Sequence, residues 1–527
     1  MTQSRMTVIR GGRLVDIRAH RAPPADILIT GDVIADVGPP GLSAPQDAIV
    51  IDARGRLLHP GLVNAHMHGH GNLGKGMGDR WTLELLLTAG PWISGSRTLE
   101  DKYLGTLVGA IEMLLKGCTA CYDLTAEFPA PTQEGIEACA RAYADIGMRA
   151  VVAPMMATNS FFESIPGLME VLPPALQADV ARLRVAPAEA SIAATRKVLD
   201  QWRFDRDSVR PAVAPTIPHH CSDAFMIGCG ELARDHAVGL HMHVQESKVQ
   251  AIVALQKYGK SATAHLQALG LLGPDFVVAH GVWLDHDDMR RLADHGSHVA
   301  HNPGSNMRLG NGLADMRGML DRRLNVGIGT DGANCSDNLN MYEAMRLASF
   351  ASKVQGPATE RWMTTEEILE AATIGGATAL GFGERIGRIA PGCKADIVFL
   401  DTTNVNWMPI NDPTNQLVHS EDGSAVHSVM VGGRMVVENR KPVGIDMAQL
   451  AHRVEQARER LEGANIGNKQ LYEKLAGVVN AFCPGIARTP YHIDRFGGGH
   501  HDHQHDHAHR PGAAAGMRHA PGPTHTR

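Results

Sequence analysis

The chain has 527 residues, which is more than one ordinary domain requires and enough to bury a large hydrophobic core. Its formal net charge is -6 at pH 7, so it lacks the basic excess that a nucleic-acid or anionic-membrane partner requires. We therefore expect a small-molecule partner, with no nucleic acid and no membrane.

The cysteines and the first residues favour a cytoplasmic protein. The eight cysteines are scattered, without the spacing of a disulfide framework, which favours a reducing compartment. The opening stretch MTQSRMTVIRGGRLVD has no apolar run long enough for a signal peptide or a membrane span. Cys118 and Cys121 have C-x-x-C spacing, but without a thioredoxin-like context we interpret them as buried structural residues.

The first 60 residues predict β-strands. Short apolar stretches alternate with polar residues in TVIRGGRLVD, DILITGDVIADVG and AIVIDARGRLLHPG, with Gly, Pro and Asp between them. The same turn chemistry returns in KADIVFLD and HSVMVGGRMVVENRK. We therefore predict one small composite β-sandwich domain, built from residues 1–60 and 385–445.

Between these two segments, apolar runs alternate with helical stretches. RAVVAPMMA, VGLHMHVQES, DFVVAHGVWL and LNVGIGTDG indicate buried strands, and segments such as TRKVLDQWRF indicate helices. Continuous apolar strands that alternate with helices are typical of a buried parallel sheet, and about eight such units over ~300 residues favour a closed barrel. We predict an α/β fold in which residues 61–384 form a (β/α)8 TIM-like barrel.

The last part of the chain divides into two predicted segments. Residues 446–496, which include DMAQLAHRVEQARERLEGA, predict a helical extension. Residues 497–527 are rich in Gly, Pro and His, cannot bury apolar surface, and predict a disordered tail. The irregularly spaced histidines of this tail leave two interpretations open: a low-affinity metal reservoir, or a segment without function.

Polar side chains capable of metal binding follow the ends of several predicted strands, which form the functional face of a (β/α) barrel. His66 and His68 have i, i+2 spacing, which places both side chains on one face of an extended chain. The other strand-end residues are His243, Glu246, His280 and Asp331. Three imidazoles and one carboxylate suit a divalent zinc or iron that keeps one position open for water.

The first histidine cluster also lies in a glycine-rich stretch, because Gly69, Gly71 and Gly74 form G-x-G-x-x-G. We interpret this match to a nucleotide-binding turn as accidental, since no βαβ unit with an acidic residue after its second strand is evident. GHGNLGKGMGDRW is instead predicted to be a loop over the pocket mouth, with His70 outside the metal ligands.

Five segments together resemble one known family. PGLVNAHMH, HVQES, VVAHGVWL, VAHNPGSNMRLGNG and GIGTDGANCSDNLNMYEAMRLA are similar to the signature segments of the amidohydrolase superfamily. The resemblance spans residues 1 to about 445 and points to the branch that holds cytosine and guanine deaminases, S-adenosylhomocysteine and methylthioadenosine deaminases and s-triazine hydrolases. It implies that the metal ligands are His66, His68, His243 and Asp331. It also implies that the catalytic residues are Glu246, His280 and Asp331.

The resemblance further implies one divalent metal ion, zinc, with iron as the alternative. Two-metal relatives bridge their ions with a carboxylated lysine at the fourth strand, and RPAVAPTIPHHCSD contains no lysine. The same segment departs from the family pattern P-H-x-x-Y-x-C-S and keeps only Cys221 and Ser222. This departure argues against a nucleoside-like substrate.

The function implied by the resemblance is a hydrolytic deaminase of an amino-substituted nitrogen heterocycle, such as a free base or a pterin. Metal-activated water attacks the carbon of a C=N unit and ammonia leaves. An s-triazine chlorohydrolase or aminohydrolase and an S-adenosylhomocysteine/methylthioadenosine deaminase are the alternatives within the family. A structural scaffold and a nicotinamide-dependent oxidoreductase are the alternatives from other classes. We expect a homo-oligomer, a dimer or tetramer.

Candidate substrate contacts come from three segments near these motifs. They are Trp81 and Glu84 just after the glycine-rich loop, His219 at the fourth strand end, and His301 and Asn306 in VAHNPGSNMRLGNG. A solvated-loop role is equally open for Trp81 and Glu84, and turn capping by Asn and Ser is favoured over substrate contact for the NPGSN stretch that holds Asn306.

Overall fold

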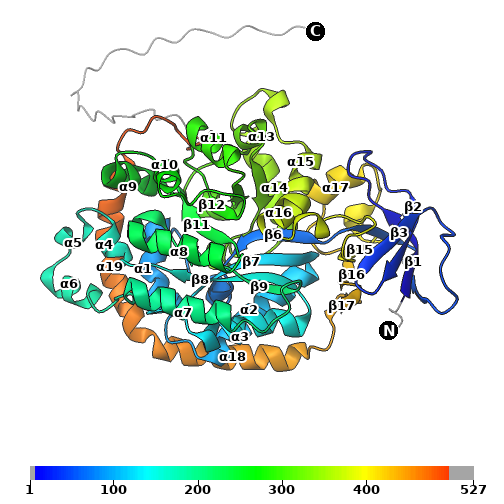
Figure 1. Ribbon diagram of the computed structural model, residues 1–527, viewed down its shortest axis with the longest axis horizontal. Coiled ribbons are helices and arrows are strands. Elements are labelled where there is room, and N and C mark those ends of the chain that lie inside the picture. The colour runs from blue at the N-terminus through cyan, green and yellow to red at the C-terminus, as the bar shows by residue number, and fades with distance from the viewer. Residues whose placement is uncertain (1–5, 498–527) are drawn as a thin grey trace, which may run out of the picture.

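The structure is a computed structural model and describes residues 6–497. Its centre is a ring of short strands with helices around it, and strands from both ends of the chain form a separate sheet at one side (Figure 1). The segment predicted to be a His-rich tail lies outside the described residues, apart from its first glycine.

The barrel strands are parallel and fall into two hydrogen-bonded groups. The first group has the order β10-β8-β7-β6, with β9 paired to β8, and the second has the order β11-β12-β13-β14. Their bounds are β6 (Leu62–Met67), β7 (Cys118–Ala126), β8 (Arg149–Met156), β9 (Val209–Pro211), β10 (Ala214–Pro215), β11 (Leu240–Val244), β12 (Phe276–His280), β13 (His298–His301) and β14 (Asn325–Ile328).

Backbone hydrogen bonds join the two groups into a closed ring. On one side, the His241 N–H donates to the Val213 carbonyl at 3.0 Å. On the other side, the Asp331 N–H donates to the His66 carbonyl at 2.9 Å. A Cβ at Gly329 would lie 2.8 Å from the backbone nitrogen and oxygen of His66, so this closure requires glycine. β9 and β10 both pair with β8 and share one position of the ring, so the nine strands make eight positions. The predicted (β/α)8 TIM-like barrel is therefore present.

Helices cover the outside of the barrel, and their ends follow ordinary capping chemistry. α2 begins after Thr98, which forms a capping box with Asp101, and α3 ends at Gly147 with a φ of 75°. The longer barrel helices are α1 (Leu83–Ser94), α2 (Leu99–Leu115), α3 (Gln133–Ile146), α7 (Ala188–Asp200), α8 (Asp223–Asp235), α9 (Lys248–Tyr258), α11 (His286–Asp294) and α14 (Met341–Lys353). The shorter ones are α4 (Phe161–Ser164), α5 (Leu168–Val171), α6 (Pro174–Val180), α10 (Ala262–Ala268), α12 (Pro303–Arg308), α13 (Met316–Asp321), α15 (Thr365–Glu370), α16 (Gly376–Ala379) and α17 (Pro413–His419).

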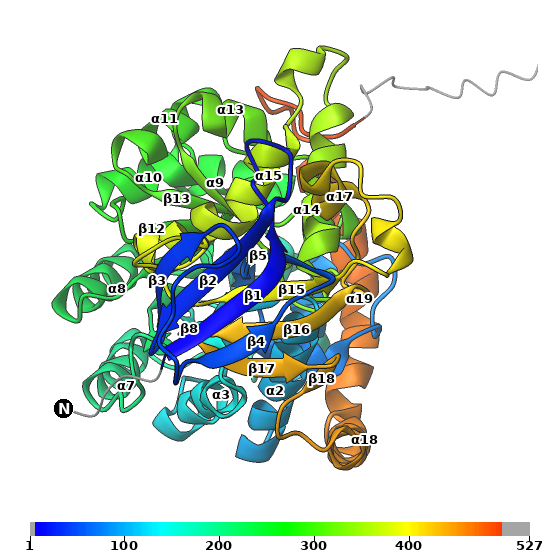
Figure 2. The same cartoon turned by 90° about the vertical axis from the view of Figure 1, so that its right-hand side faces the viewer.

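Strands from the two ends of the chain pair in one mixed sheet, which faces the viewer in Figure 2. Its order is β18-β17-β16-β15-β5-β1-β2-β3, with β4 paired to β1. The bounds are β1 (Met6–Leu14), β2 (Pro24–Thr30), β3 (Val33–Gly38), β4 (Ile49–Asp52), β5 (Arg56–Pro60), β15 (Ile397–Asp401), β16 (Val426–Val431), β17 (Arg434–Glu438) and β18 (Lys441–Pro442). The strands from the two ends of the chain therefore do form one unit. Strand order alone does not test whether this sheet folds into two layers, so the expected β-sandwich stays a prediction.

The expected helical extension consists of α18 (Met447–Ala464) and α19 (Ile466–Ala487). α18 runs beneath α2 and α3 in Figure 1. Leu475, Val479 and Cys483 of α19 are buried in a hydrophobic cluster with Leu85 and Leu86 of α1. Among residues 6–497, no helix has the length and apolarity needed to cross a membrane.

A buried ion pair connects the barrel to the separate sheet. Arg149 begins β8, and its guanidinium donates to both carboxylate oxygens of Asp396, at 2.8 and 3.1 Å. The two side chains are only 4% and 2% exposed. The Gly432 N–H also donates to Asp396, so the carboxylate is held from both parts of the fold. Removing one charge would leave the other buried without its partner.

We expect Asp396→Asn to lower the free energy of unfolding by about 3 kcal/mol, because it leaves the Arg149 guanidinium uncompensated. The matched control is Asp207→Asn, which breaks a partly exposed pair with Arg385 and should cost less than about 1 kcal/mol. Urea denaturation followed by circular dichroism measures both values. Equal losses for the two variants would contradict the structural role of the buried pair.

Candidate metal centre and active site

Three barrel strands, β6, β11 and β14, bring the predicted metal ligands to one end of the barrel. His66 lies in β6 and His243 lies in β11. His68 directly follows β6, and Asp331 lies three residues after the end of β14. Asp331 Oδ1 lies 3.2 Å from His68 Nε2 and 3.6 Å from His66 Nε2. All four side chains are buried. The barrel fold therefore brings together the four residues that the sequence predicts as ligands, although His66 and Asp331 lie near opposite ends of the barrel sequence.

The hydrogen bonds of two histidines define a cation site. His68 donates its Nδ1–H to the Leu124 carbonyl at 2.7 Å, and His243 donates its Nδ1–H to the Thr216 carbonyl at 2.9 Å. Each Nε2 therefore carries a lone pair, and the two Nε2 atoms face each other at 3.2 Å. Two facing acceptors repel unless a cation lies between them, so this pair fits a metal ion.

His66 supports the same interpretation. Both of its ring nitrogens are buried without a hydrogen-bond partner, which is costly for a polar group unless a ligand compensates. Burial lowers the pKa of His66 to about 3, so the ring is neutral and able to donate a lone pair. His66, His68 and Asp331 offer ligand atoms within 4.8 Å of one another, as do His66, His243 and His280. The donor set of imidazoles with one carboxylate fits zinc.

The two predicted proton carriers lie beside this site. His280 ends β12, and its Nε2 lies 3.6 Å from Glu246 Oε2 and 3.9 Å from Asp331 Oδ2. Burial raises the pKa of Glu246 well above its ordinary value, and the nearby carboxylates of Asp331 and Glu84 act in the same direction. His280 and Asp331 have positive φ angles of 69° and 63°, a strained backbone that is concentrated at functional sites.

The segment after β13, which begins with the short helix α12, orients both predicted proton carriers. His280 donates its Nδ1–H to Asn306 Oδ1 at 2.9 Å, which leaves a lone pair on Nε2. Asn311 Nδ2 donates to Glu246 Oε1 at 3.0 Å, and Ser305 Oγ donates to Asp331 Oδ2 at 2.6 Å. We define residues 302–315 as the orienting loop.

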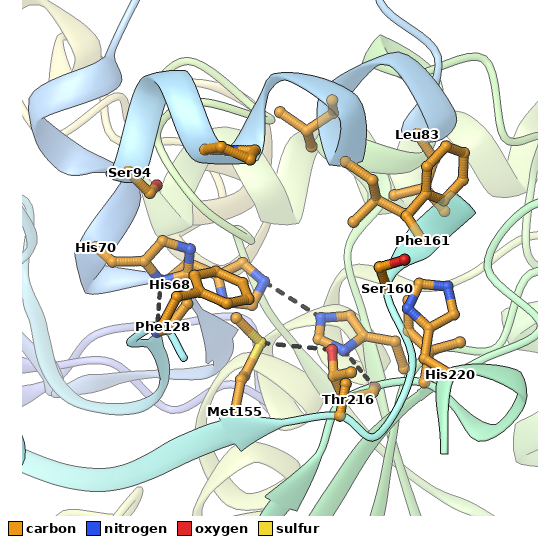
Figure 3. Close-up of a pocket in the computed structure, with 18 of the residues that line it drawn as sticks. His68, His70, Leu83, Ser94, Phe128, Met155, Ser160, Phe161, Thr216 and His220 are labelled. Atoms are coloured by element: carbon orange, nitrogen blue, oxygen red, sulfur yellow. Dashed lines mark hydrogen bonds between the residues drawn. The ribbon is translucent and has the colours of Figure 1, made fainter. Parts of the chain in front are cut away.

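A cavity of about 210 Å³ opens onto the metal centre, with His68, His243, Glu246, His280 and Asp331 in its lining. Its other walls are mostly apolar and come from α1, from the segment between β8 and β9, and from the strand ends. They include Leu83, Leu86, Phe128, Met155, Phe161 and Leu183. Figure 3 shows Phe161 and Leu83 across the cavity from His68, with His220 near Phe161 and Thr216 between Met155 and His220.

The five candidate substrate contacts lie outside this lining. Trp81 packs against Trp92 and Tyr472, and Glu84 accepts a hydrogen bond from Ser247 Oγ. The His219 carbonyl accepts from Lys257, and the Asn306 amide oxygen accepts from His280. His301 is buried at the end of β13. Direct substrate contact by these side chains therefore stays a prediction.

Several site residues were missed in the sequence. Asn311 and Ser305 lie in the quoted motif VAHNPGSNMRLGNG, so their polar side chains could have been singled out. His220 lines the cavity, whereas the adjacent His219 does not. The sequence alone does not distinguish these two neighbouring histidines. Phe161 begins the four-residue helix α4, and Leu183 lies in the connection between α6 and α7. Both stretches are too short to show a periodic pattern in the sequence.

Comparison with known proteins agrees with this geometry. The model of the amidohydrolase family matches residues 57–436. The chain belongs to the amidohydrolase family. The resemblance inferred from the sequence is therefore confirmed, and the chain is a hydrolase of the type that acts on non-peptide C–N bonds.

Similar proteins of this family include named deaminases. The 5-methylthioadenosine/S-adenosylhomocysteine deaminase of Syntrophobacter fumaroxidans is 32% identical over 445 residues, which cover 84% of this chain and 94% of the relative. The 5'-deoxyadenosine deaminase of Methanobrevibacter smithii is 30% identical and covers 83% of this chain and 94% of the relative.

Solved structures show the same fold. An adenosine deaminase from Xanthomonas campestris with bound zinc has a TM-score of 0.76 at 27% identity, covering 87% of this chain and 98% of that structure. The atrazine chlorohydrolase from Arthrobacter aurescens, solved with zinc, has a TM-score of 0.77 at 28% identity, covering 86% and 100%. Both neighbours are zinc-containing structures, in agreement with a metal centre in this barrel.

We expect His243→Ala and Asp331→Ala to lose most of the bound zinc, because each removes a donor that lies against the site. The matched control, His452→Ala, changes an exposed histidine of α18 and should keep the full metal content. Plasma mass spectrometry of the dialysed proteins measures zinc per chain. Retention of a full zinc complement by both variants would contradict the proposed centre.

Proposed function

We propose that the protein is a metal-dependent hydrolytic deaminase of an amino-substituted nitrogen heterocycle, which converts a C(NH2)=N unit into a ring carbonyl and ammonia. One observation carries this proposal. The facing Nε2 atoms of His68 and His243 form a cation site in the same cavity lining as Glu246 and His280. A metal, a base and an acid next to one cavity are the groups that such a hydrolysis requires.

The proposed cofactor is one zinc ion held by His66, His68, His243 and Asp331, with iron as the alternative. The unpartnered ring nitrogens of His66 and the zinc in two neighbouring structures support it. Such an ion supplies Lewis acidity, which makes hydroxide available near neutral pH.

The side chains around the site would then move the protons. His280 Nε2 has a lone pair because its Nδ1–H is engaged by Asn306, so it can accept the proton of the attacking water. Asp331, whose Oδ2 is held by Ser305, helps to orient that water. Glu246 would donate its proton to the ring nitrogen beside the attacked carbon. The proton that His280 accepted from water would go to the leaving amine, and the Glu246 carboxylate would take back a proton from the new hydroxyl group as the ring carbonyl forms.

The cavity walls bear on the proposed substrate class. Apart from Glu246 and Asp331, the residues that line the cavity carry no carboxylate, and they include no lysine or arginine. A charged substituent would lose its hydration here without gaining a partner, so we propose a neutral heterocycle with an apolar substituent.

The names of the relatives support an adenosine-type compound as our first candidate among such heterocycles. The free base or pterin preferred from the sequence comes second. An s-triazine, as in the chlorohydrolase neighbour, comes third.

The remaining assignments are also proposals. We divide the chain into residues 1–60 and 385–445 as a β-sandwich domain, 61–384 as the hydrolase barrel and 446–496 as the helical extension. The eight free cysteines support a reducing, cytoplasmic location. A homo-oligomer, either a dimer or a tetramer, is kept from the sequence as the proposed assembly.

We expect Glu246→Gln to keep its zinc and to lower kcat roughly 10²- to 10⁴-fold, because the amide cannot deliver the proton. Glu459→Gln on the exposed surface of α18 is the matched control and should retain full kcat. Ammonia release and zinc content are measured on the same preparations. Normal turnover by Glu246→Gln would show that the proton carrier is assigned to the wrong residue.

The substrate proposal predicts an order of kcat/KM values. Methylthioadenosine and 5'-deoxyadenosine, whose 5' groups are uncharged, should react faster than S-adenosylhomocysteine, whose amino-acid group must shed its hydration. Ammonia release across a panel that also contains guanine, pterins and s-triazines measures this order. The fastest reaction with S-adenosylhomocysteine would contradict the neutral-substrate inference, and the absence of ammonia from every compound would contradict the deaminase itself.

A further inference from the structure

The chain after α19 returns to the barrel and packs beside the active-site loops. We define residues 491–497 as the C-terminal strap. The rings of Tyr491 and Phe496 contact the buried Trp283, with centroid distances of 6.0 and 5.2 Å. His492 Nε2 also lies 2.8 Å from Asp285 Oδ2. The strap therefore covers the segment that directly follows β12 and His280.

Arg495 fixes the strap to the orienting loop. Its side chain is only 12% exposed, and Nη2 donates to the Leu284 carbonyl at 2.7 Å. The Arg495 carbonyl in turn accepts from the Leu313 N–H at 2.8 Å. A Cβ at Gly312, which has a φ of 114°, would lie 2.8 Å from the Arg495 oxygen. This close approach requires a glycine in the orienting loop.

Two hydrogen bonds continue from the strap contacts to the proton carrier. Trp283, which is completely buried, donates its Nε1–H to the Asn311 carbonyl at 2.8 Å. The Asn311 side chain donates to Glu246 Oε1 at 3.0 Å. Asn311 is thus held through its backbone on one side and orients Glu246 through its amide on the other.

We propose that the C-terminal strap is a positioning element of the active site, which acts through Trp283 and Asn311 to hold the Glu246 carboxyl group. This inference rests on the proposed role of Glu246 as the proton carrier. The family match ends at residue 436, so the strap belongs to an extension of this chain beyond the matched region. Arg495, Phe496 and Trp283 are positioning residues, since none of them lines the cavity.

The geometry explains why the loop depends on an external support. Gly310 and Gly312 both have positive φ and flank Asn311, so the backbone on either side of it is free to adopt many conformations. The strap hydrogen bond to Leu313 and the Trp283 hydrogen bond to Asn311 restrict that freedom. The fixed Asn311 amide then donates its hydrogen bond to Oε1 of Glu246, and Oε2 faces His280 Nε2. Small displacements of a catalytic group lower rates strongly even when substrate still binds.

The test compares two strap-side variants with a matched arginine control. Arg495→Ala removes the donor to Leu284 and the ion pair with Asp315 of the orienting loop, at 3.8 Å. Trp283→Phe removes the Nε1–H donor and keeps a ring. Arg458→Ala changes an exposed arginine of α18. Steady-state kinetics, zinc content and amide hydrogen exchange of residues 309–315 are measured on all three and on the unchanged chain.

We expect Arg495→Ala and Trp283→Phe to keep their zinc and to lower kcat roughly 10- to 100-fold at unchanged KM. In both, residues 309–315 should exchange several times faster than in the unchanged chain. Arg495→Lys, which keeps one donor for the Leu284 carbonyl, should recover part of kcat. Arg458→Ala should match the unchanged chain in every readout.

Two results would overturn the inference. Unchanged exchange of residues 309–315 in both variants would show that the strap does not hold the loop. Faster exchange with unchanged kcat would show that the strap only stabilises the fold. Failure of the proposed function is distinguishable, because the unchanged chain would then release no ammonia while the exchange comparison would still report on the strap.

Discussion

Two imidazole lone pairs face each other at the end of the barrel, and the site depends on this arrangement. His68 and His243 each give their Nδ1–H to a backbone carbonyl, so their Nε2 atoms meet at 3.2 Å without a proton between them. The repulsion between them is relieved when a cation binds. The carbonyls belong to Leu124 of β7 and to Thr216 just after β10. The strand next to each ligand's own strand therefore supplies the acceptor that sets its tautomer.

Hydrogen bonds from the orienting loop fix the proposed proton carriers in a similar way. One loop supplies an amide oxygen to His280, a hydroxyl to Asp331 and an amide N–H to Glu246. The contacts to His280 and Glu246 leave one atom of each side chain available: Nε2 of His280 and Oε2 of Glu246. Because the loop contains flanking glycines, its order depends on packing from outside the barrel. The strap after α19 supplies contacts of that kind.

The sequence predicted the barrel and the six polar residues at its strand ends, because both follow from local regularities. Apolar runs mark parallel strands, and polar residues after them, such as His66 and Asp331, must collect at one barrel end. The same regularities could not show that Asn311 meets Glu246, since 65 residues separate them. Arg495 and Leu284 are 211 residues apart, and nothing local in either segment marks their contact. The cavity wall at Phe161 was also missed, because the four-residue helix α4 is too short to show a period in the sequence.

The central claim is that one metal ion lies between these imidazoles and the carboxylate of Asp331. X-ray absorption at the zinc edge of the fully loaded protein tests it most directly, because the spectrum reports ligand type and neighbouring metals. The account predicts one zinc per chain with only nitrogen and oxygen ligands, including the outer-shell scattering of imidazole rings. A sulfur ligand, or a second metal scattering from within a few ångströms, would contradict it.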